Sequence, residues 1–171
     1  MQINVDLLAV TGRQVDADDA TPWAAEAARD ALEGDVVTLS ASLDIAQPKA
    51  DRHVDIRIEA TATVSRHCDR CRESIVLSVS TSRQLGYLPA GGTGGDEVDL
   101  EAEELEVGWY ESPFVDLGHI LREALALELP ARVTCSDAAS CEARTAALLA
   151  DSTEDDGAVG HPAFAVLKQL Q

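Results

Sequence analysis

Two runs of alternating apolar and polar residues, separated by a turn with two cysteines, constrain the fold of this chain most strongly. Before the turn, apolar side chains occupy every even position from Val54 to Val64, and polar side chains occupy the odd positions between them. After the turn, Ile75, Leu77 and Val79 stand at alternate positions. A period of two is typical of strands with one buried face. The sequence therefore predicts a long β-hairpin with Cys68-Asp69-Arg70-Cys71 at its tip.

The remaining apolar patterns predict further strands and two helices. Alternation predicts strands at residues 3–7 and 37–45, whereas we expect the Asp-rich residues 11–20 to form a loop. One helix is expected to begin at Thr21-Pro22 and to end before Gly34. The other is expected to begin at Ser112-Pro113, because a serine followed by proline favours a helix start, and to end at Leu129-Pro130.

Together these elements predict an α+β fold. We expect an antiparallel β-meander or partly closed barrel, with the amphipathic helix over residues 112–128 packed on it and the Cys-x-x-Cys turn at a hairpin tip. Six apolar side chains of the hairpin and this helix are expected to be buried together: Ile56, Ile58, Leu77, Leu117, Ile120 and Leu121.

Length and hydropathy predict the domain organisation and the compartment. We expect residues 1–150 to form a single α+β domain that contains the Cys-x-x-Cys turn, and residues 151–171 to form an acidic tether and an apolar C-terminal motif. No apolar run approaches the roughly 18 residues of a membrane span, so we expect no membrane association. Residues 1–6 have neither a basic start nor an apolar run, so we expect the protein in the cytoplasm.

The net charge of −18, from 31 acidic and 13 basic residues, constrains the partners. Nucleic-acid binding usually shows a basic footprint, and a chain this acidic repels a polyanion but attracts basic proteins. The seven acids of residues 96–106 are either a contact for such a partner or a solvated loop. One small basic cluster, Arg66, Arg70 and Arg72, surrounds the cysteine turn and can add a minor contact with RNA.

The four cysteines form two pairs that can hold one metal ion. Cys68 and Cys71 have the two-residue spacing of a zinc site, whereas five residues separate Cys135 from Cys141. Zinc held by Cys68, Cys71, Cys135 and Cys141 is one interpretation, with His67 or His161 as a substitute for one thiol. Reduced thiols without metal are the second. A redox pair is the third, although a thioredoxin-like βαβ context is missing.

Motifs of enzymes are not found in the sequence. It contains no G-x-S-x-G, HExxH, phosphate-binding loop or GxGxxG pattern. The glycines of residues 91–95 have neither a lysine nor an apolar helix after them, so they do not predict a phosphate site. We therefore expect a non-enzyme without a small-molecule substrate.

Three features resemble the YceD-type family, the large ribosomal RNA subunit accumulation proteins. Cys68-Asp69-Arg70-Cys71 is similar to the family's Cys-x-Arg-Cys. An acidic stretch then leads to a helix with Glu123 and Leu127 that closes in Leu129-Pro130. Residues 162–167, with the sequence PAFAVL, look like the family's Pro-x-Phe-Ala-x-Leu ending. The resemblance covers roughly residues 35–171.

The resemblance implies a function without implying a catalytic residue. It implies a cytoplasmic protein that is needed for large-subunit ribosomal RNA to be made, processed or kept stable. Its expected partner is ribosomal RNA or a ribosomal precursor, reached through a basic ribosomal protein that the acidic charge attracts. The alternatives are an acidic chaperone-like module for a basic protein unrelated to RNA, and a thiol or zinc redox protein.

Overall fold

The computed structural model describes residues 1–8, 11–46, 53–90, 107–111 and 113–152, which fall into two compact units. The first unit is Met1–Arg66 with Ser74–Ala131, and the second is His67–Glu73 with Arg132–Gln171. Most of residues 151–171 lie outside the described part, so the division of the chain at residue 150 stays a prediction. Within the described residues, no helix has the length and apolarity needed to cross a membrane.

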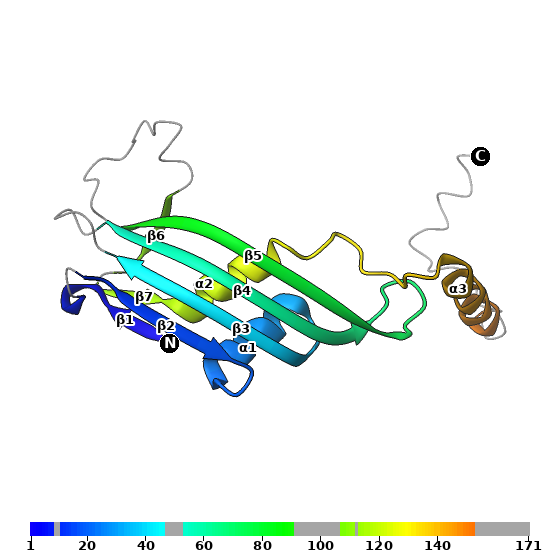
Figure 1. Cartoon of the computed structure of the whole chain (residues 1–171). Coiled ribbons are helices and arrows are strands. Elements are labelled where there is room, and N and C mark those ends of the chain that lie inside the picture. The colour runs from blue at the N-terminus through cyan, green and yellow to red at the C-terminus, as the bar shows by residue number, and fades with distance from the viewer. Residues whose placement is uncertain (9–10, 47–52, 91–106, 112, 153–171) are drawn as a thin grey trace, which may run out of the picture. The chain divides into compact units, whose positions relative to one another are not determined.

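A five-stranded sheet forms the centre of the first unit (Figure 1). Its strands, in spatial as in sequence order, are β2 (Arg13–Asp18), β3 (Asp35–Ala46), β4 (Val54–His67), β5 (Ser74–Pro89) and β6 (Val107–Tyr110). β2 and β4 each pair with β3 antiparallel. The predicted α+β meander with its hairpin is confirmed, and the sheet is open, with β2 and β6 as its edges. β6 pairs with β5 in the parallel direction, which the meander prediction did not include.

The expectation of a loop over residues 11–20 is wrong, because Arg13–Asp18 form the edge strand β2. This strand pairs with β3 from Arg13↔Ile45 to Asp18↔Ser40. Edge strands often carry charged side chains, which oppose further strand addition. Here the Asp16 carboxylate accepts a hydrogen bond of 2.8 Å from the Ser42 hydroxyl of β3. A polar, Asp-rich segment is therefore compatible with a paired strand.

The helix α1 (Pro22–Leu32) begins at the predicted proline and buries small side chains: Ala24, Ala27, Ala28 and Ala31, followed by Leu32. Its C-terminal cap is Glu33, which adopts the left-handed conformation at φ 51°, in place of the predicted Gly34. A side chain at Gly34 is excluded for another reason, the close approach of β4. A Cβ at this position would lie 2.7 Å from the backbone oxygen of Ser65 on β4.

The helix α2 (Leu117–Ala126) begins later than the predicted Ser112-Pro113 start. Residues Phe114–Asp116 instead form β7, which pairs antiparallel with β1 (Gln2–Asn4). The Asp116 carboxylate accepts hydrogen bonds from the backbone N–H groups of Gly118 and His119, at 2.9 and 3.2 Å. Aspartate at this position caps a helix N-terminus strongly, so the chain had a second start signal four residues after Ser112.

The remaining predicted elements are partly confirmed. The expected strand at residues 3–7 ends at Asn4, and a short 3-10 helix, η1 (Val5–Leu7), follows it. The expected strand at residues 37–45 lies within β3. α1 and α2 pack on each other and on the sheet, and the core lies between these two layers (Figure 1).

Five of the six predicted core side chains belong to this core. These five are at most 1% exposed, namely Ile56, Ile58, Leu117, Ile120 and Leu121. Leu77 is partly buried and packs against them. Arg66, predicted to be part of a basic surface cluster, is also packed: its side chain is 7% exposed and its guanidinium donates to the backbone oxygen of Leu32, at the end of α1. Arg66 is therefore not available for RNA as that cluster required.

Candidate metal centre

The turn that joins β4 to β5 forms a tight knuckle around Cys68. The backbone N–H of Cys68 donates to Glu73 O at 2.8 Å, and that of Arg72 donates to Cys68 O at 3.0 Å. The Cys68 sulfur in turn accepts from the N–H groups of Arg70 and Cys71, at 3.4 and 3.5 Å. Arg72 completes the turn with φ 62°. These bonds hold both thiols of the Cys-x-x-Cys motif in one small region.

Asp69 fastens the segment before Cys135 to this knuckle. Its backbone N–H donates to Val133 O at 2.8 Å, and its carboxylate Oδ2 accepts from Val133 N at 2.7 Å. This reciprocal pair joins residues 64 positions apart in the sequence. Cys135 therefore lies beside the knuckle because Asp69 satisfies both polar backbone groups of Val133.

The third part of the cluster is the first turn of α3 (Ala138–Ser152). Asp137 caps this helix: its carboxylate accepts from the N–H groups of Ala139 and Ser140, and from the Ser140 hydroxyl. These hydrogen bonds lower the pKa of Asp137 below its usual value, and the bond from the Ser140 hydroxyl has the largest effect. The cap fixes the start of α3 so that Cys141 lies in the first turn, where it is 2% exposed.

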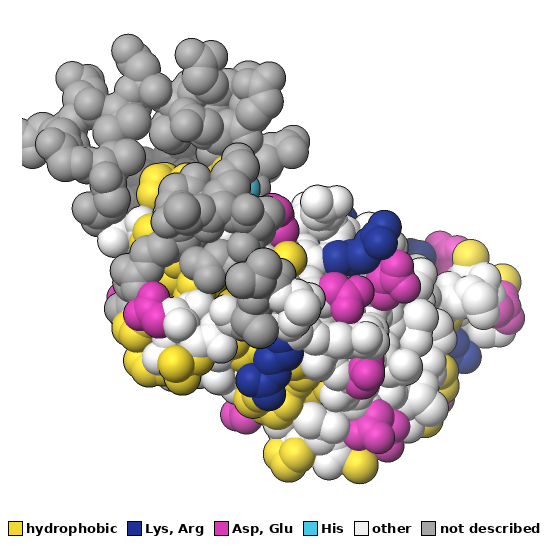
Figure 2. All heavy atoms as spheres, turned by 60° about the vertical axis from the view of Figure 1, so that its left-hand side comes forward, with side chains coloured by type: hydrophobic (Ala, Val, Ile, Leu, Met, Phe, Trp, Pro, Cys, Tyr) yellow, Lys and Arg dark blue, Asp and Glu magenta, His cyan; other side chains and the backbone are white. Residues whose placement is uncertain are grey.

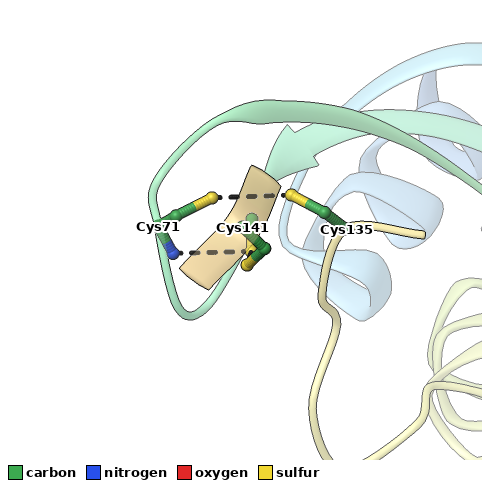
Figure 3. A group of neighbouring side chains, drawn as sticks. Cys71, Cys135 and Cys141 are labelled. Carbon is green, nitrogen blue, oxygen red and sulfur yellow. Dashed lines mark hydrogen bonds between the residues drawn. The ribbon is translucent and has the colours of Figure 1, made fainter. Parts of the chain in front are cut away.

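The four cysteine sulfurs lie within 4.8 Å of one another. The sulfur atoms of Cys68 and Cys141 are 3.7 Å apart. Those of Cys71 and Cys135 point toward one another and are 3.5 Å apart (Figure 3). A disulfide requires about 2.05 Å, and all four thiols are free. Sulfurs at about 2.3 Å from a central zinc ion would be about 3.8 Å from one another, which is close to these separations. The prediction that the chain brings the two pairs together is confirmed, and the four cysteines can hold a metal ion.

The thiols differ in acidity. The backbone N–H of Cys71, against the effect of burial, lowers the pKa of the Cys68 thiol to about 6. The Arg144 guanidinium lowers the pKa of Cys71. Burial raises the pKa of Cys135, and it raises that of Cys141 to about 12. Because thiolates this close repel one another, all four ionise together only around a cation.

Arg144 of α3 supplies one positive charge beside the sulfurs. Its Nη2 donates to Cys135 Sγ at 3.3 Å, and its Nε lies 3.7 Å from the Glu73 carboxylate. The neighbouring thiols of Cys71 and Cys135 raise the pKa of Arg144 further, so this charge is permanent. A centre of four thiolates and one divalent ion carries two negative charges, which the guanidinium partly balances.

Of the two predicted substitute ligands, His67 is described by the structure and is not part of the cluster. The Nδ1 of His67 lies 2.9 Å from Arg72 O, so this ring is used in the turn. His161 lies outside the described residues. The sequence prediction missed Asp69, Asp137 and Arg144, which position or neutralise the cysteines. Asp137 follows a helix-cap pattern and could have been found, whereas the contacts of Asp69 and Arg144 depend on residues distant in sequence.

The described part of the second unit has almost no hydrophobic core apart from this cluster. Among its described residues, the buried apolar side chains are Val133 and three of the cysteines, Cys68, Cys71 and Cys141. Leu148 and Leu149 of α3 are 48% and 63% exposed. Units this small usually need a metal or disulfides to stay folded. A metal ion bound by the four thiols is therefore the main candidate for the interaction that stabilises α3 beside the knuckle.

The fold and the cluster define the class of this protein: an α+β protein whose hairpin tip contributes to a group of four free thiols, three of them buried. The chain belongs to the family described as large ribosomal RNA subunit accumulation protein YceD, whose model matches residues 56–171. The matched region contains all four cysteines. No curated protein and no solved structure matches the chain.

Proposed function

We propose that this protein is a non-enzymatic ribosome biogenesis factor of the cytoplasm, which supports the synthesis, processing or stability of 23S ribosomal RNA. The observation that carries the proposal is the family match over residues 56–171, under a description that names large ribosomal RNA subunit accumulation. The predicted motifs agree with it, since the Cys-x-Arg-Cys turn and the helix that closes in Leu129-Pro130 both lie in the matched region.

Zinc is the metal that the cluster fits best. Four cysteine sulfurs within 4.8 Å of one another are a ligand set typical of structural zinc sites, in which the protein supplies every ligand. A catalytic zinc site keeps one position open for water or substrate, and four thiolates would leave none. Zinc held by Cys68, Cys71, Cys135 and Cys141 would therefore stabilise the second unit, which supports a role in binding and not in catalysis.

The charge of the chain supports a basic protein as the direct partner. The net charge of −18 opposes contact with the phosphates of RNA, while it attracts a basic ribosomal protein. Arg66, one of three arginines that favoured direct RNA contact, is packed against α1. The acidic residues 96–106 and the apolar residues 162–167, predicted as contacts for a partner, lie outside the described residues. The same charge also suits a chaperone for a basic protein unrelated to RNA.

Deletion of the gene in its own organism is the test of this function. We expect the ratio of mature 23S to 16S ribosomal RNA to fall, because the large-subunit RNA would be made, processed or retained less well. The measurement is quantification of both RNAs together with sucrose-gradient ribosome profiles, and restoration by the wild-type gene is the control. A normal ratio and normal profiles in a clean deletion would contradict the proposal and leave the RNA-independent chaperone.

Replacement of Asp69 tests how the metal centre is assembled. We expect Asp69→Ala to weaken zinc binding by about tenfold or more, the usual effect of losing a residue that orients metal ligands, because Val133 and Cys135 lose their anchor. Competition with a chromophoric chelator measures the affinity. Asp69→Asn keeps an acceptor for Val133 N and should lose less. Equal affinities of Asp69→Ala and the wild type would show that Cys135 is placed without this anchor.

A further inference from the structure

A pocket of about 400 Å³ lies in the first unit, where β1, β6 and β7 meet the start of α2. Its floor is apolar and consists of side chains that are at most 8% exposed, namely Tyr87, Tyr110, Val115 and Ile120. Its rim includes two aromatic side chains that are about half exposed, Trp109 at 48% and Phe114 at 45%. The volume is within the range of small ligand sites. Figure 2 brings this end of the molecule forward and shows hydrophobic side chains exposed beside acidic ones.

Gly108 explains how the floor is shaped. A Cβ at this position would lie 2.4 Å from the ring of Tyr87, so β6 can approach the ring only because residue 108 has no side chain. Burial raises the pKa of Tyr87 to about 12, with Glu123 as a further cause. The floor therefore presents a neutral apolar surface, partly aromatic and partly aliphatic, to a ligand in the pocket.

The charged residues of the lining are both acidic. Asp116 is already engaged, since it caps α2 and its Oδ1 lies 3.7 Å from the Met1 ammonium. Glu111 is exposed on the rim, and no lysine or arginine belongs to the described lining. The described residues 107–111 and 113–129 contain four acidic residues and one basic residue, Arg122, so this part of the first unit is negatively charged overall. The pocket is therefore an electronegative site with aromatic walls.

This combination is complementary to the side chain of arginine or lysine. Aromatic rings attract a cation over their faces, and a carboxylate beside them adds a charge-assisted hydrogen bond. The aliphatic stem of such a side chain packs on an apolar floor while its charged head stays at a polar rim. A nucleobase can also stack on Trp109, but its phosphates would meet the acidic surroundings. The positive end of α2 is already capped by Asp116, so it does not attract an anion here.

We infer that this pocket binds an arginine or lysine side chain of a basic polypeptide segment. The inference rests on the proposed function for the class of partner, and it gives that partner a docking site within the described residues. Trp109 and Phe114 hold the cationic head between aromatic surfaces, and Glu111 pairs with it. The protein would then recognise a basic segment by one inserted side chain as well as by its overall charge.

The test measures binding of a fluorescein-labelled nona-arginine peptide to the full-length protein at about 150 mM salt, where diffuse attraction is screened. We expect Trp109→Ala to weaken binding about tenfold and Glu111→Gln to weaken it several-fold, because these changes remove the cation–π contact and the paired charge. Two matched controls lie outside the pocket. Glu59→Gln, on β4, removes the same charge, and Val76→Ala, on β5, trims another exposed apolar side chain. Both should stay within about twofold of the wild type.

Several results would overturn the inference. Equal effects of Glu111→Gln and Glu59→Gln, with Trp109→Ala unchanged, would show that net charge alone attracts the peptide. Loss of binding to a labelled uridine 15-mer in Trp109→Ala, with peptide binding intact, would show a nucleobase site. Tighter peptide binding in Phe164→Ser would show that the C-terminal segment of the chain itself occupies the pocket. Glu111→Gln keeps the test valid if Trp109→Ala fails to fold.

One variant in the deletion strain separates the pocket inference from the proposed function. Trp109→Ala is also introduced into the deletion strain. Unchanged peptide binding and full restoration of 23S ribosomal RNA by this variant would overturn the pocket inference and leave the proposed function intact. A normal ratio of 23S to 16S ribosomal RNA in the deletion strain would overturn the proposed function, whether or not the peptide binds to the pocket.

Discussion

Replacement of Cys141 by serine is expected to abolish tight zinc binding and to release α3 from the knuckle. Cys141 is 2% exposed, and its sulfur lies 3.7 Å from that of Cys68. Zinc binding contributes roughly 10–16 kcal/mol of apparent free energy in small zinc domains, where it is also folding free energy. Among the described residues of the second unit, Val133 is the one buried apolar side chain besides cysteines, so little else can replace that contribution.

Hydrogen exchange followed by mass spectrometry measures this effect segment by segment. Amides of α3 should lose protection in Cys141→Ser, whereas those of β3 and β4 should keep it, because the first unit has its own core. Ser136→Ala, an exposed change in the same segment, is the control and should leave both unchanged. Full protection of α3 in Cys141→Ser, with unaltered zinc affinity, would show that the thiols do not hold this unit together.

Replacement of Leu121 by alanine is expected to lower the free energy of unfolding of the first unit by about 2–5 kcal/mol. Leu121 is fully buried on α2, in the core between the helices and the sheet. The change removes a buried side chain and leaves a cavity that a densely packed core refills only in part. Zinc content should not change, since no cysteine of the cluster belongs to the first unit.

Urea denaturation followed by tryptophan fluorescence measures the loss, because Trp23 and Trp109 both belong to the first unit. Leu127→Ala is the matched control: it removes the same atoms at the end of the same helix, where the side chain is 61% exposed. Its effect should stay within about 0.5 kcal/mol. If Leu121→Ala unfolds at the same urea concentration as Leu127→Ala, the sheet and α2 are less tightly packed than the structure implies.

The long strands could be predicted from sequence because one face of each is buried. Alternation from Val54 to Val64 defines β4, and Ile56 and Ile58 lie in the core as expected. Alternation does not reveal β2, whose polar residues are suited to an edge. The start of α2 was misplaced because Ser112-Pro113 and Asp116 are both good start signals, and only pairing of β7 with β1 decides between them.

The four cysteine ligands of the cluster could be predicted from the sequence, but the contacts that bring them together could not. The spacing of Cys68 and Cys71 indicates a metal-type turn, and two further cysteines complete a set of four. The bond from Val133 N to Asp69 joins residues 64 positions apart, and no local pattern predicts such a contact. The pocket at Trp109 was missed for a similar reason, because its lining comes from five separate elements and the loop between β6 and β7.

The zinc content of the native protein tests the central claim most directly. The protein is purified under reducing conditions without added metal or chelator, and its metals are measured by mass spectrometry. We expect one zinc ion per chain, retained through gel filtration and released when the four thiols are modified. Less than about one tenth of an equivalent, with all four cysteines open to alkylation in the folded protein, would contradict a metal centre formed by Cys68, Cys71, Cys135 and Cys141.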